Sequence, residues 1–354
     1  MTIPGKDPRL ARYGETNLGM PLELIDGLIV PNDLFFVRSN GPTPAIDSAT
    51  WRLRVDGRVE QSLELSLADL QRLPRQELTA FLECAGNGRS RYSPPAEGTT
   101  WKNDAVGNAV WTGTALRHVL DQAGAEPGAV DVVTQGADMP GMQRGLPLPI
   151  ALDPATMLVW AMNGAPLPVT HGGPVRLLVP GWAGIASTKW LAGITVAETP
   201  FAGFWNTENY TIQTADGERV APVREMPVKS IISQPVTAAS IAAGPQSIIG
   251  YAWSGHGAIA RVEISVDGGA TWQEARIVEE AGRHSWVRFA YEWDAVPGEA
   301  HLCSRATDAR GLTQPRQAAW NAKGYLNNGI YEVVVKVGDG QDSSWERRMD
   351  AGWA

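Results

Sequence analysis

The stretch TAFLECAGNGRSRY, residues 79–92, changes from apolar residues to glycines and arginines around one cysteine, Cys84. A cysteine that serves only packing is expected inside the apolar part, whereas Cys84 stands where that part ends. Gly86 and Gly88 remove side chains and leave the backbone open to a ligand. The arginines favour a thiolate, which binds soft metals or acts as a nucleophile. The residue types alone leave three roles open for Cys84: a buried structural thiol, a nucleophile or a metal ligand.

The overall composition is typical of a folded protein with two domains. The chain has 354 residues, and a domain averages about 150 residues. Hydrophobic residues make up 44% and charged residues 19%, which predicts a substantial core. The formal charge is -8 and no basic stripe is present, so we expect no nucleic-acid partner. No apolar run approaches the roughly 20 residues that cross a bilayer, so we expect no membrane span.

The two cysteines, Cys84 and Cys303, favour a reducing compartment. They cannot build a disulfide framework and form no CxxC pair, although one bridge between them is conceivable. The first residues, MTIPGKDPRLARYGE, contain neither the apolar segment of a secretory signal nor a twin-arginine pair. We therefore expect a cytoplasmic protein, or a periplasmic one if a leader was removed.

The first two-thirds of the chain reads as a mixed α+β domain with many loops. Residues 51–59, WRLRVDGRV, alternate between apolar and polar side chains as in a strand. Residues 111–124, WTGTALRHVLDQAG, predict a helix, in which Leu116 and Val119 share one face and Gly124 ends the helix.

From about Val228 the sequence consists of short stretches in which apolar and polar residues alternate, as in β-strands. The stretch VEISVDGGATWQ, residues 262–273, predicts a hairpin, because Asp-Gly tolerates the positive φ of a tight turn. This pattern favours an all-β sandwich of immunoglobulin type. We expect domains at 1–227 and 228–340, followed by a polar tail at 341–354.

Two further stretches combine apolar strands with polar ends. NDLFFVRSNGPTP, residues 32–44, ends in hydrogen-bonding side chains, and THGGPVRLLVPGWAGIASTKW, residues 170–190, interleaves cations with glycines. Glycine-rich loops with Arg and Lys bind phosphate through backbone N–H groups and charge. A solvated strand end and a plain turn are the alternatives. No GxGxxG or GxxxxGK[ST] motif is present, so no nucleotide fold is supported.

Together these stretches resemble the molybdenum-cofactor domain of sulfite oxidases and the related assimilatory nitrate reductases. Six segments follow the family's order between about residues 30 and 330: FFVRSNGPTP, LECAGNGRSR, WTGTALRHVL, MNGAPLP, HGGPVRLLVPGWAGIASTKWL and GYAWSG…VEISVDGGATW. The resemblance implies an α+β molybdopterin-binding domain followed by an all-β, immunoglobulin-like dimerisation domain, and hence a homodimer. It also implies a bound molybdenum–molybdopterin. No CxxCH motif is present, and we expect no haem in this chain.

The resemblance assigns Cys84 as the single protein ligand to molybdenum, while the pterin dithiolene supplies the other sulfurs. It implies cofactor contacts for Phe36, Val37, Arg38, Ser39, Asn40, Cys84, Asp138, His171, Arg176, Ser187, Thr188 and Lys189. It implies catalytic or substrate-binding roles for Arg38, Arg89, Trp101, Tyr210 and Lys323.

The implied activity is oxidation of sulfite to sulfate by two-electron oxo transfer, with electrons passed to a separate acceptor, a cytochrome or oxygen. Two departures from the family pattern bear on the substrate. Ser39-Asn40 replaces the family's Asn-His, and Lys323 stands where sulfite oxidases usually carry an arginine. Lysine keeps the charge but loses paired donors. Oxidation of another sulfur compound, or reduction of an oxyanion such as nitrate, therefore stays open. A cofactor-free binding module is the alternative outside the enzymes.

Overall fold

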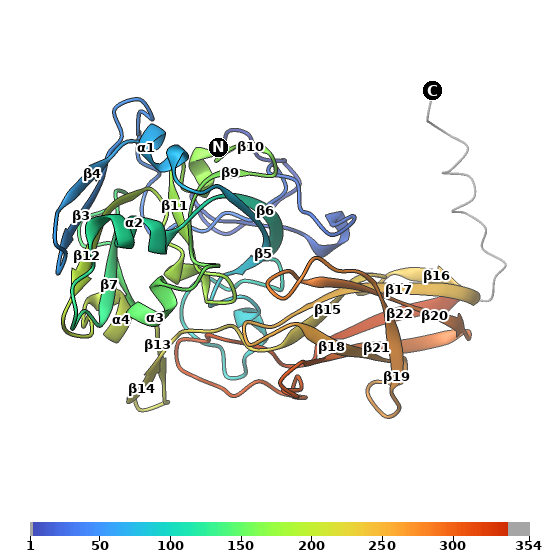
Figure 1. Ribbon diagram of the computed structural model, residues 1–354. Coiled ribbons are helices and arrows are strands. Elements are labelled where there is room, and N and C mark those ends of the chain that lie inside the picture. Colours follow the sequence, from blue (N-terminus) through green and yellow to red (C-terminus); the bar gives the residue numbers. More distant parts are fainter. Residues whose placement is uncertain (1–2, 339–354) are drawn as a thin grey trace, which may run out of the picture. The chain divides into compact units, whose positions relative to one another are not determined.

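The structure is a computed structural model that describes residues 3–338 (Figure 1). It divides into two compact units. Unit 1 contains the chain up to Pro21, Ile29–Pro227 and Ala319–Asn327, and unit 2 contains Leu22–Leu28, Val228–Ala318 and the chain from Asn328. The domain limits expected from the sequence do not anticipate the two exchanged segments, 22–28 and 319–327. The expected polar tail, 341–354, lies outside the described residues.

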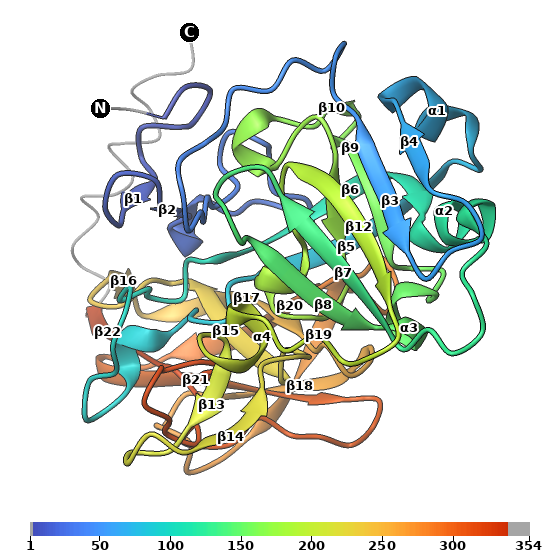
Figure 2. The same ribbon diagram turned by 90° about the vertical axis from the view of Figure 1, so that its left-hand side faces the viewer.

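Unit 1 is built on two five-stranded sheets. The strands of the first are β10 (Ala165–Pro166), β9 (Met157–Met162), β6 (Val106–Ala115) and β5 (Gln76–Glu83), with β11 (Arg176–Leu178) also paired to β9. The second, visible in Figure 2, has the order β4 (Leu63–Leu65), β3 (Leu53–Gly57), β12 (Leu191–Ala197), β7 (Asp131–Gly136) and β8 (Gln143–Pro147). Within this second sheet, β3 and β12 pair in parallel and the other neighbours are antiparallel.

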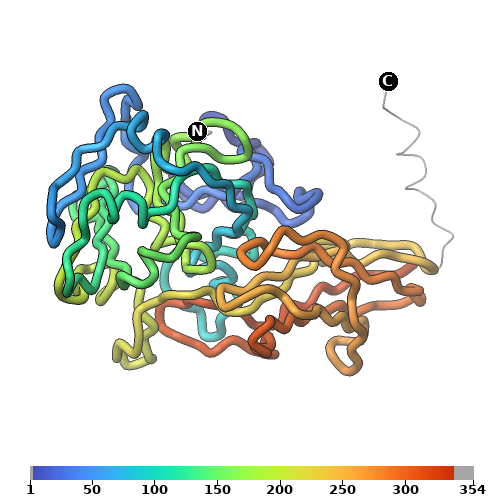
Figure 3. The backbone as a smooth tube through the Cα atoms, viewed as in Figure 1, coloured from blue at the N-terminus to red at the C-terminus, as the bar shows by residue number. Residues whose placement is uncertain are grey.

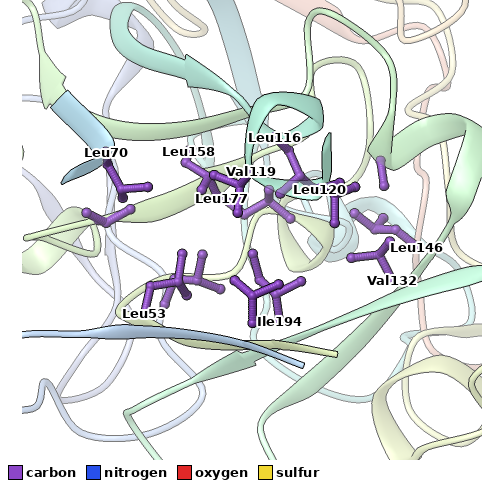
Figure 4. Close-up of a cluster of buried hydrophobic side chains, with 14 of the residues drawn as sticks. Leu53, Leu70, Leu116, Val119, Leu120, Val132, Leu146, Leu158, Leu177 and Ile194 are labelled. Atoms are coloured by element: carbon purple, nitrogen blue, oxygen red, sulfur yellow. The ribbon is translucent and has the colours of Figure 1, made fainter. Parts of the chain in front are cut away.

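The core of unit 1 takes apolar side chains from both sheets and from the helices α1 (Leu67–Arg72) and α2 (Leu116–Ala123). Figure 4 shows Leu116, Val119 and Leu120 of α2 reaching into this cluster. Gly124 ends α2 at a φ of +69°, as the sequence predicts. The expected start at Trp111 is wrong, because Trp111–Ala115 continue β6 and pair with Met157–Met162 of β9. No helix within residues 3–338 is long and apolar enough to cross a membrane.

Unit 2 is a β-sandwich, traced from yellow to red in Figure 3. Its hydrogen-bonded strand path is β15 (Lys229–Gln234), β17 (Gly244–Trp253), β20 (Val287–Ala295), β19 (Gln273–Glu279), β18 (Ile259–Ser265), β21 (Gly298–Asp308), β22 (Glu332–Gly338) and β16 (Ser240–Ala242). The predicted hairpin joins β18 to β19, with Gly268 at a φ of +70°. Cys303 is buried in this unit, and both cysteines are free thiols, so no bridge joins them.

The remaining short elements of unit 1 connect or cover these sheets. They are β1 (Ala11–Arg12), β2 (Leu18–Gly19), α3 (Leu148–Ala151), α4 (Phe204–Thr207), β13 (Thr211–Gln213), β14 (Arg219–Pro222) and the 3-10 helices η2 (Arg89–Arg91), η3 (Val169–His171) and η4 (Gly184–Ala186). Among the residues singled out from the sequence, Arg89 lies in η2, His171 in η3 and Arg176 in β11, whereas most of the others lie in loops. In unit 2, η1 (Leu22–Leu24) belongs to the exchanged N-terminal segment.

Candidate active site

One cavity of unit 1 collects side chains from segments far apart in the sequence. It is lined by every predicted cofactor residue except Val37. Cys84 follows the end of β5, His171 ends η3, and Arg176 begins β11. The cavity holds about 700 Å³ of empty space, including its opening to solvent.

Two predicted site residues are not brought to the site. Val37 exchanges backbone hydrogen bonds with Leu18 at 2.8 and 2.9 Å, and it is absent from the cavity wall. Trp101 is fully buried, packs against Tyr13 with 4.5 Å between ring centroids, and lines neither the cavity nor the pocket next to it. The structure thus places both residues outside the walls of these two hollows.

Buried cations dominate one part of the cavity wall. Arg176 donates from Nη1 to the carbonyl of His171 at 2.9 Å and from Nη2 to the carbonyl of Ser187 at 2.8 Å. Lys189 donates from Nζ to the hydroxyl of Ser39 at 2.7 Å. These hydrogen bonds fix the positions of the cations, but their partners are neutral groups that leave the positive charge uncompensated.

The electrostatics of this wall call for an anion. Burial lowers the pKa of Arg176 to about 9. Burial and neighbouring cations hold the pKa values of Lys189 and His171 well below their usual ranges. Asp138 is the acidic residue of the wall, so positive charge is in excess. Because a buried cation is stabilised by an opposite charge, the donor set fits the phosphate of a pterin cofactor.

Cys84, Arg38 and Tyr210 line both this cavity and a second pocket. The thiol of Cys84 is a soft ligand that suits the metal of such a cofactor. The guanidinium of Arg38 donates from Nη2 to Oδ1 of Asn40 at 2.6 Å. Cys84 therefore lies where the cavity and the second pocket adjoin.

Arg89 is the best-anchored cation of the second pocket. Its Nε donates to the carbonyl of Lys323 and its Nη1 to that of Thr99, both at 2.9 Å. The guanidinium lies over the ring of Tyr325, 5.1 Å from the centroid. Its Nη2 makes no hydrogen bond with residues 3–338. The other arginine of the opening stretch, Arg91, is exposed and lines neither hollow.

Three glycines make room for Arg89. A Cβ at Gly86, Gly98 or Gly324 would come within 2.6, 2.7 and 2.8 Å of its side chain. The interpretation that Gly86 leaves space for a ligand is therefore wrong, because the space is filled by the arginine. Gly88 serves the backbone, since its φ of +83° lies in the left-handed region.

The far side of the pocket is formed by residues 209–210 and by the returning segment 319–327. The rings of Tyr210 and Tyr325 stack with centroids 5.1 Å apart. Nδ2 of Asn40 approaches the hydroxyl of Tyr210 at 3.5 Å. Lys323 forms an ion pair with Glu97, with Nζ 3.1 Å from Oε2. Arg38, Arg89, Tyr210 and Lys323 are thus brought together, as the sequence predicts, around a space bounded by three cations.

Sequence reasoning missed three residues of this region. Tyr325 lies two positions after Lys323 in the stretch WNAKGYLNN, and its aromatic ring was the available signal. Glu97 is in a loop between the cysteine stretch and Trp101, and no motif marks it. Lys6, which contacts His171, lies in the N-terminal segment that was considered only as a possible leader.

Comparisons with known proteins bear on the class of protein to which the chain belongs. Residues 40–205 match the family "Oxidoreductase molybdopterin binding domain" and residues 220–338 match "Mo-co oxidoreductase dimerisation domain". The chain is 38% identical to mitochondrial sulfite oxidase of Mus musculus over 91% of its length, and spans 64% of that protein. It is 32% identical to sulfite oxidase of Arabidopsis thaliana, covering 89% of this chain and 90% of the relative.

A solved structure extends the comparison to the fold. The sulfane dehydrogenase SoxCD from Paracoccus pantotrophus superposes with a TM-score of 0.85 at 32% identity, over 95% of this chain and 88% of that chain. The fold and site define a molybdopterin-binding oxidoreductase with a β-sandwich dimerisation domain. Within this class, the chain belongs to the sulfite oxidase family.

Proposed function

We propose that this protein oxidises sulfite to sulfate with a molybdenum–molybdopterin cofactor. The observation that carries the proposal is the position of Cys84, shared by a cavity with buried cations and a pocket bounded by Arg38, Arg89 and Lys323. The sulfite oxidases among its relatives support the substrate. The bound cofactor would supply oxo transfer to sulfur and accept two electrons, which leave to a separate acceptor, a cytochrome or oxygen.

The residues of the chain would hold the two reactants. Cys84 would ligate the molybdenum, while His171, Arg176 and Lys189 would bind the phosphate of the cofactor. A small tetrahedral or pyramidal oxyanion would be held between the guanidinium of Arg38 and the Nη2 of Arg89, because guanidinium groups offer directional donors to oxyanions. This placement orients the substrate sulfur toward the cofactor and stabilises charge as it redistributes.

Tyr210 would donate its hydroxyl proton to a substrate oxygen from the wall shared by both hollows. Its ring is held by stacking on Tyr325, and its hydroxyl is within 3.5 Å of Asn40. The β-sandwich of unit 2 would form a homodimer, which the matched dimerisation family supports. Size-exclusion chromatography with light scattering would contradict the dimer if the loaded protein elutes as a monomer.

Oxidation of a sulfane-type sulfur is the second candidate. Two observations favour it: the structural likeness to a sulfane dehydrogenase, and Lys323, whose ammonium is held by Glu97 instead of being free for the anion. Steady-state assays of the molybdenum-loaded protein with ferricyanide distinguish the candidates. Turnover of sulfite, with thiosulfate slower, supports the first choice. Thiosulfate turnover without sulfite turnover would replace it by the second, and turnover of neither would reject both.

A further inference from the structure

Lys6 is distant in sequence from the residues that line the cavity, but its side chain contacts one of them, His171. Its Nζ lies 2.6 Å from Nε2 of His171 and 2.8 Å from the carbonyl oxygen of Phe35, and it also donates to the carbonyl of Asn32. Lys6 and His171 are 165 positions apart in the sequence. Lys6 itself is not part of the cavity lining. It is therefore a candidate for a positioning role and not for direct catalysis.

The three contacts of Lys6 match the donor count of an ammonium group. A lysine ammonium has three N–H donors and no acceptor, so when Lys6 is protonated Nε2 of His171 accepts the third hydrogen bond. The proton of the neutral imidazole is then on Nδ1. The ring of His171 is also held edge-on by Phe35, with centroids 5.3 Å apart. Lys6 and Phe35 together fix both the orientation and the tautomer of a ring that lines the cavity.

This arrangement is unfavourable in the absence of a bound anion. Lys6 adds positive charge beside His171 and Lys189 and lowers the pKa values of both. Asp33 is the acid that acts on Lys6, and burial outweighs it, lowering the pKa of Lys6 to about 7. A surface lysine with no function would extend into water instead. An anion such as a phosphate monoester in the cavity would offset this positive charge.

We propose that Lys6 is a positioning residue of the cofactor cavity, which holds His171 as the Nδ1–H tautomer and ties the N-terminal segment to retention of the cofactor's phosphate. The inference rests on the cofactor assigned in the proposed function. Backbone contact between Asp7 and Asp33, from N to O at 3.1 Å, keeps this segment in place. Loss of the Lys6 side chain should therefore affect the ring and the cofactor, and leave the backbone path intact.

The test compares Lys6→Met, Lys6→Arg and the matched control Lys336→Met, an exposed lysine on β22. Each protein is purified with its cofactor and diluted, and release of the pterin is followed by fluorescence after oxidation. We expect Lys6→Met to release the pterin about tenfold faster than the wild type, because one charge-assisted hydrogen bond is removed. The control should release the pterin at the wild-type rate, and Lys6→Arg should recover most of the retention.

A second readout is independent of cofactor release. Long-range ¹⁵N–¹H correlation spectra of histidine-labelled protein report the tautomer of His171. We expect Nδ1–H in the wild type and in Lys6→Arg, and a mixture of tautomers in Lys6→Met. Unchanged retention together with an unchanged tautomer in Lys6→Met would overturn the inference and leave the proposed function intact. Wild-type protein without any pterin, made in a cofactor-competent host, would overturn both.

Discussion

The substitution Tyr92→Phe tests whether the returning segment 319–327 positions the substrate pocket. The buried hydroxyl of Tyr92 donates to the carbonyl of Tyr325 at 2.9 Å and approaches that of Ala319 at 3.2 Å. Both acceptors flank Lys323, so this hydroxyl ties the segment to the Arg89 loop. Its removal should loosen the pocket and leave the cofactor cavity intact, since Tyr92 does not line that cavity.

The expected size of the change in KM follows from the hydrogen bonds that Tyr92→Phe removes. The carbonyl of Tyr325 also accepts from Nδ2 of Asn321 at 2.9 Å, so it keeps a partner after the hydroxyl is removed. The loss is therefore that of one neutral hydrogen bond, about 1 kcal/mol. If that free energy is lost from substrate binding, KM for sulfite rises about fivefold. Because the cofactor contacts are unchanged, kcat should stay within about twofold.

Tyr251→Phe in unit 2 is the matched control. The hydroxyl of the buried Tyr251 donates to the carbonyl of Gly27 at 3.0 Å, and Tyr251 lines neither the cavity nor the pocket. Ferricyanide-coupled sulfite assays and thermal unfolding are measured on both variants. We expect similar losses of stability and a KM change in Tyr92→Phe alone. An equal KM change in both variants, or none in Tyr92→Phe, would refute the positioning role of segment 319–327.

Two further predictions concern charge. Glu97→Gln frees Lys323 and should raise kcat/KM for sulfite about two- to fivefold at low salt, because an exposed ion pair is worth about 0.2–1 kcal/mol. At about 1 M salt the gain should disappear, because salt screens the charges. The control Glu64→Gln should leave kcat/KM unchanged, and a gain that does not depend on salt would argue against the electrostatic cause. Burial lowers the pKa of Lys6 from 10.5 to about 7, so below pH 7 the folded apoprotein bears the full cost of this buried charge. Between pH 7 and 10.5 only the unfolded chain keeps the proton, and stability should rise with pH by at most about 1.4 kcal/mol per unit. Urea unfolding at pH 7 and 9 measures this rise, and the same slope in Lys6→Met would contradict it.

Local patterns were sufficient for much of the fold. The hairpin at Gly268 was predictable because a two-residue signal sets both the turn and the strands that flank it. The start of α2 could not be predicted from a local pattern. Trp111–Ala115 carry no helix signal of their own, and only their pairing with β9, across a separation of about 45 residues, makes them a strand.

The same distinction applies to the site. Cys84, His171, Arg176 and Lys189 lie in compact stretches whose residue types reveal their chemistry, and the structure brings them into one cavity. Lys6 reaches the site from a distant part of the chain, so no local pattern could mark it, whereas Tyr325 lies two positions after the predicted Lys323. The prediction that Gly86 leaves space for a ligand was wrong, because this space is occupied by the side chain of its near neighbour Arg89.

The central claim is that the Cys84 sulfur binds molybdenum beside a cationic pocket. The most direct measurement is elemental analysis combined with molybdenum X-ray absorption, on wild type and Cys84→Ser from a cofactor-competent host. The account predicts roughly one molybdenum per wild-type chain, one fewer sulfur neighbour in the folded variant, and loss of sulfite oxidation. A metal-free wild type, or an unchanged sulfur shell in Cys84→Ser, would contradict it.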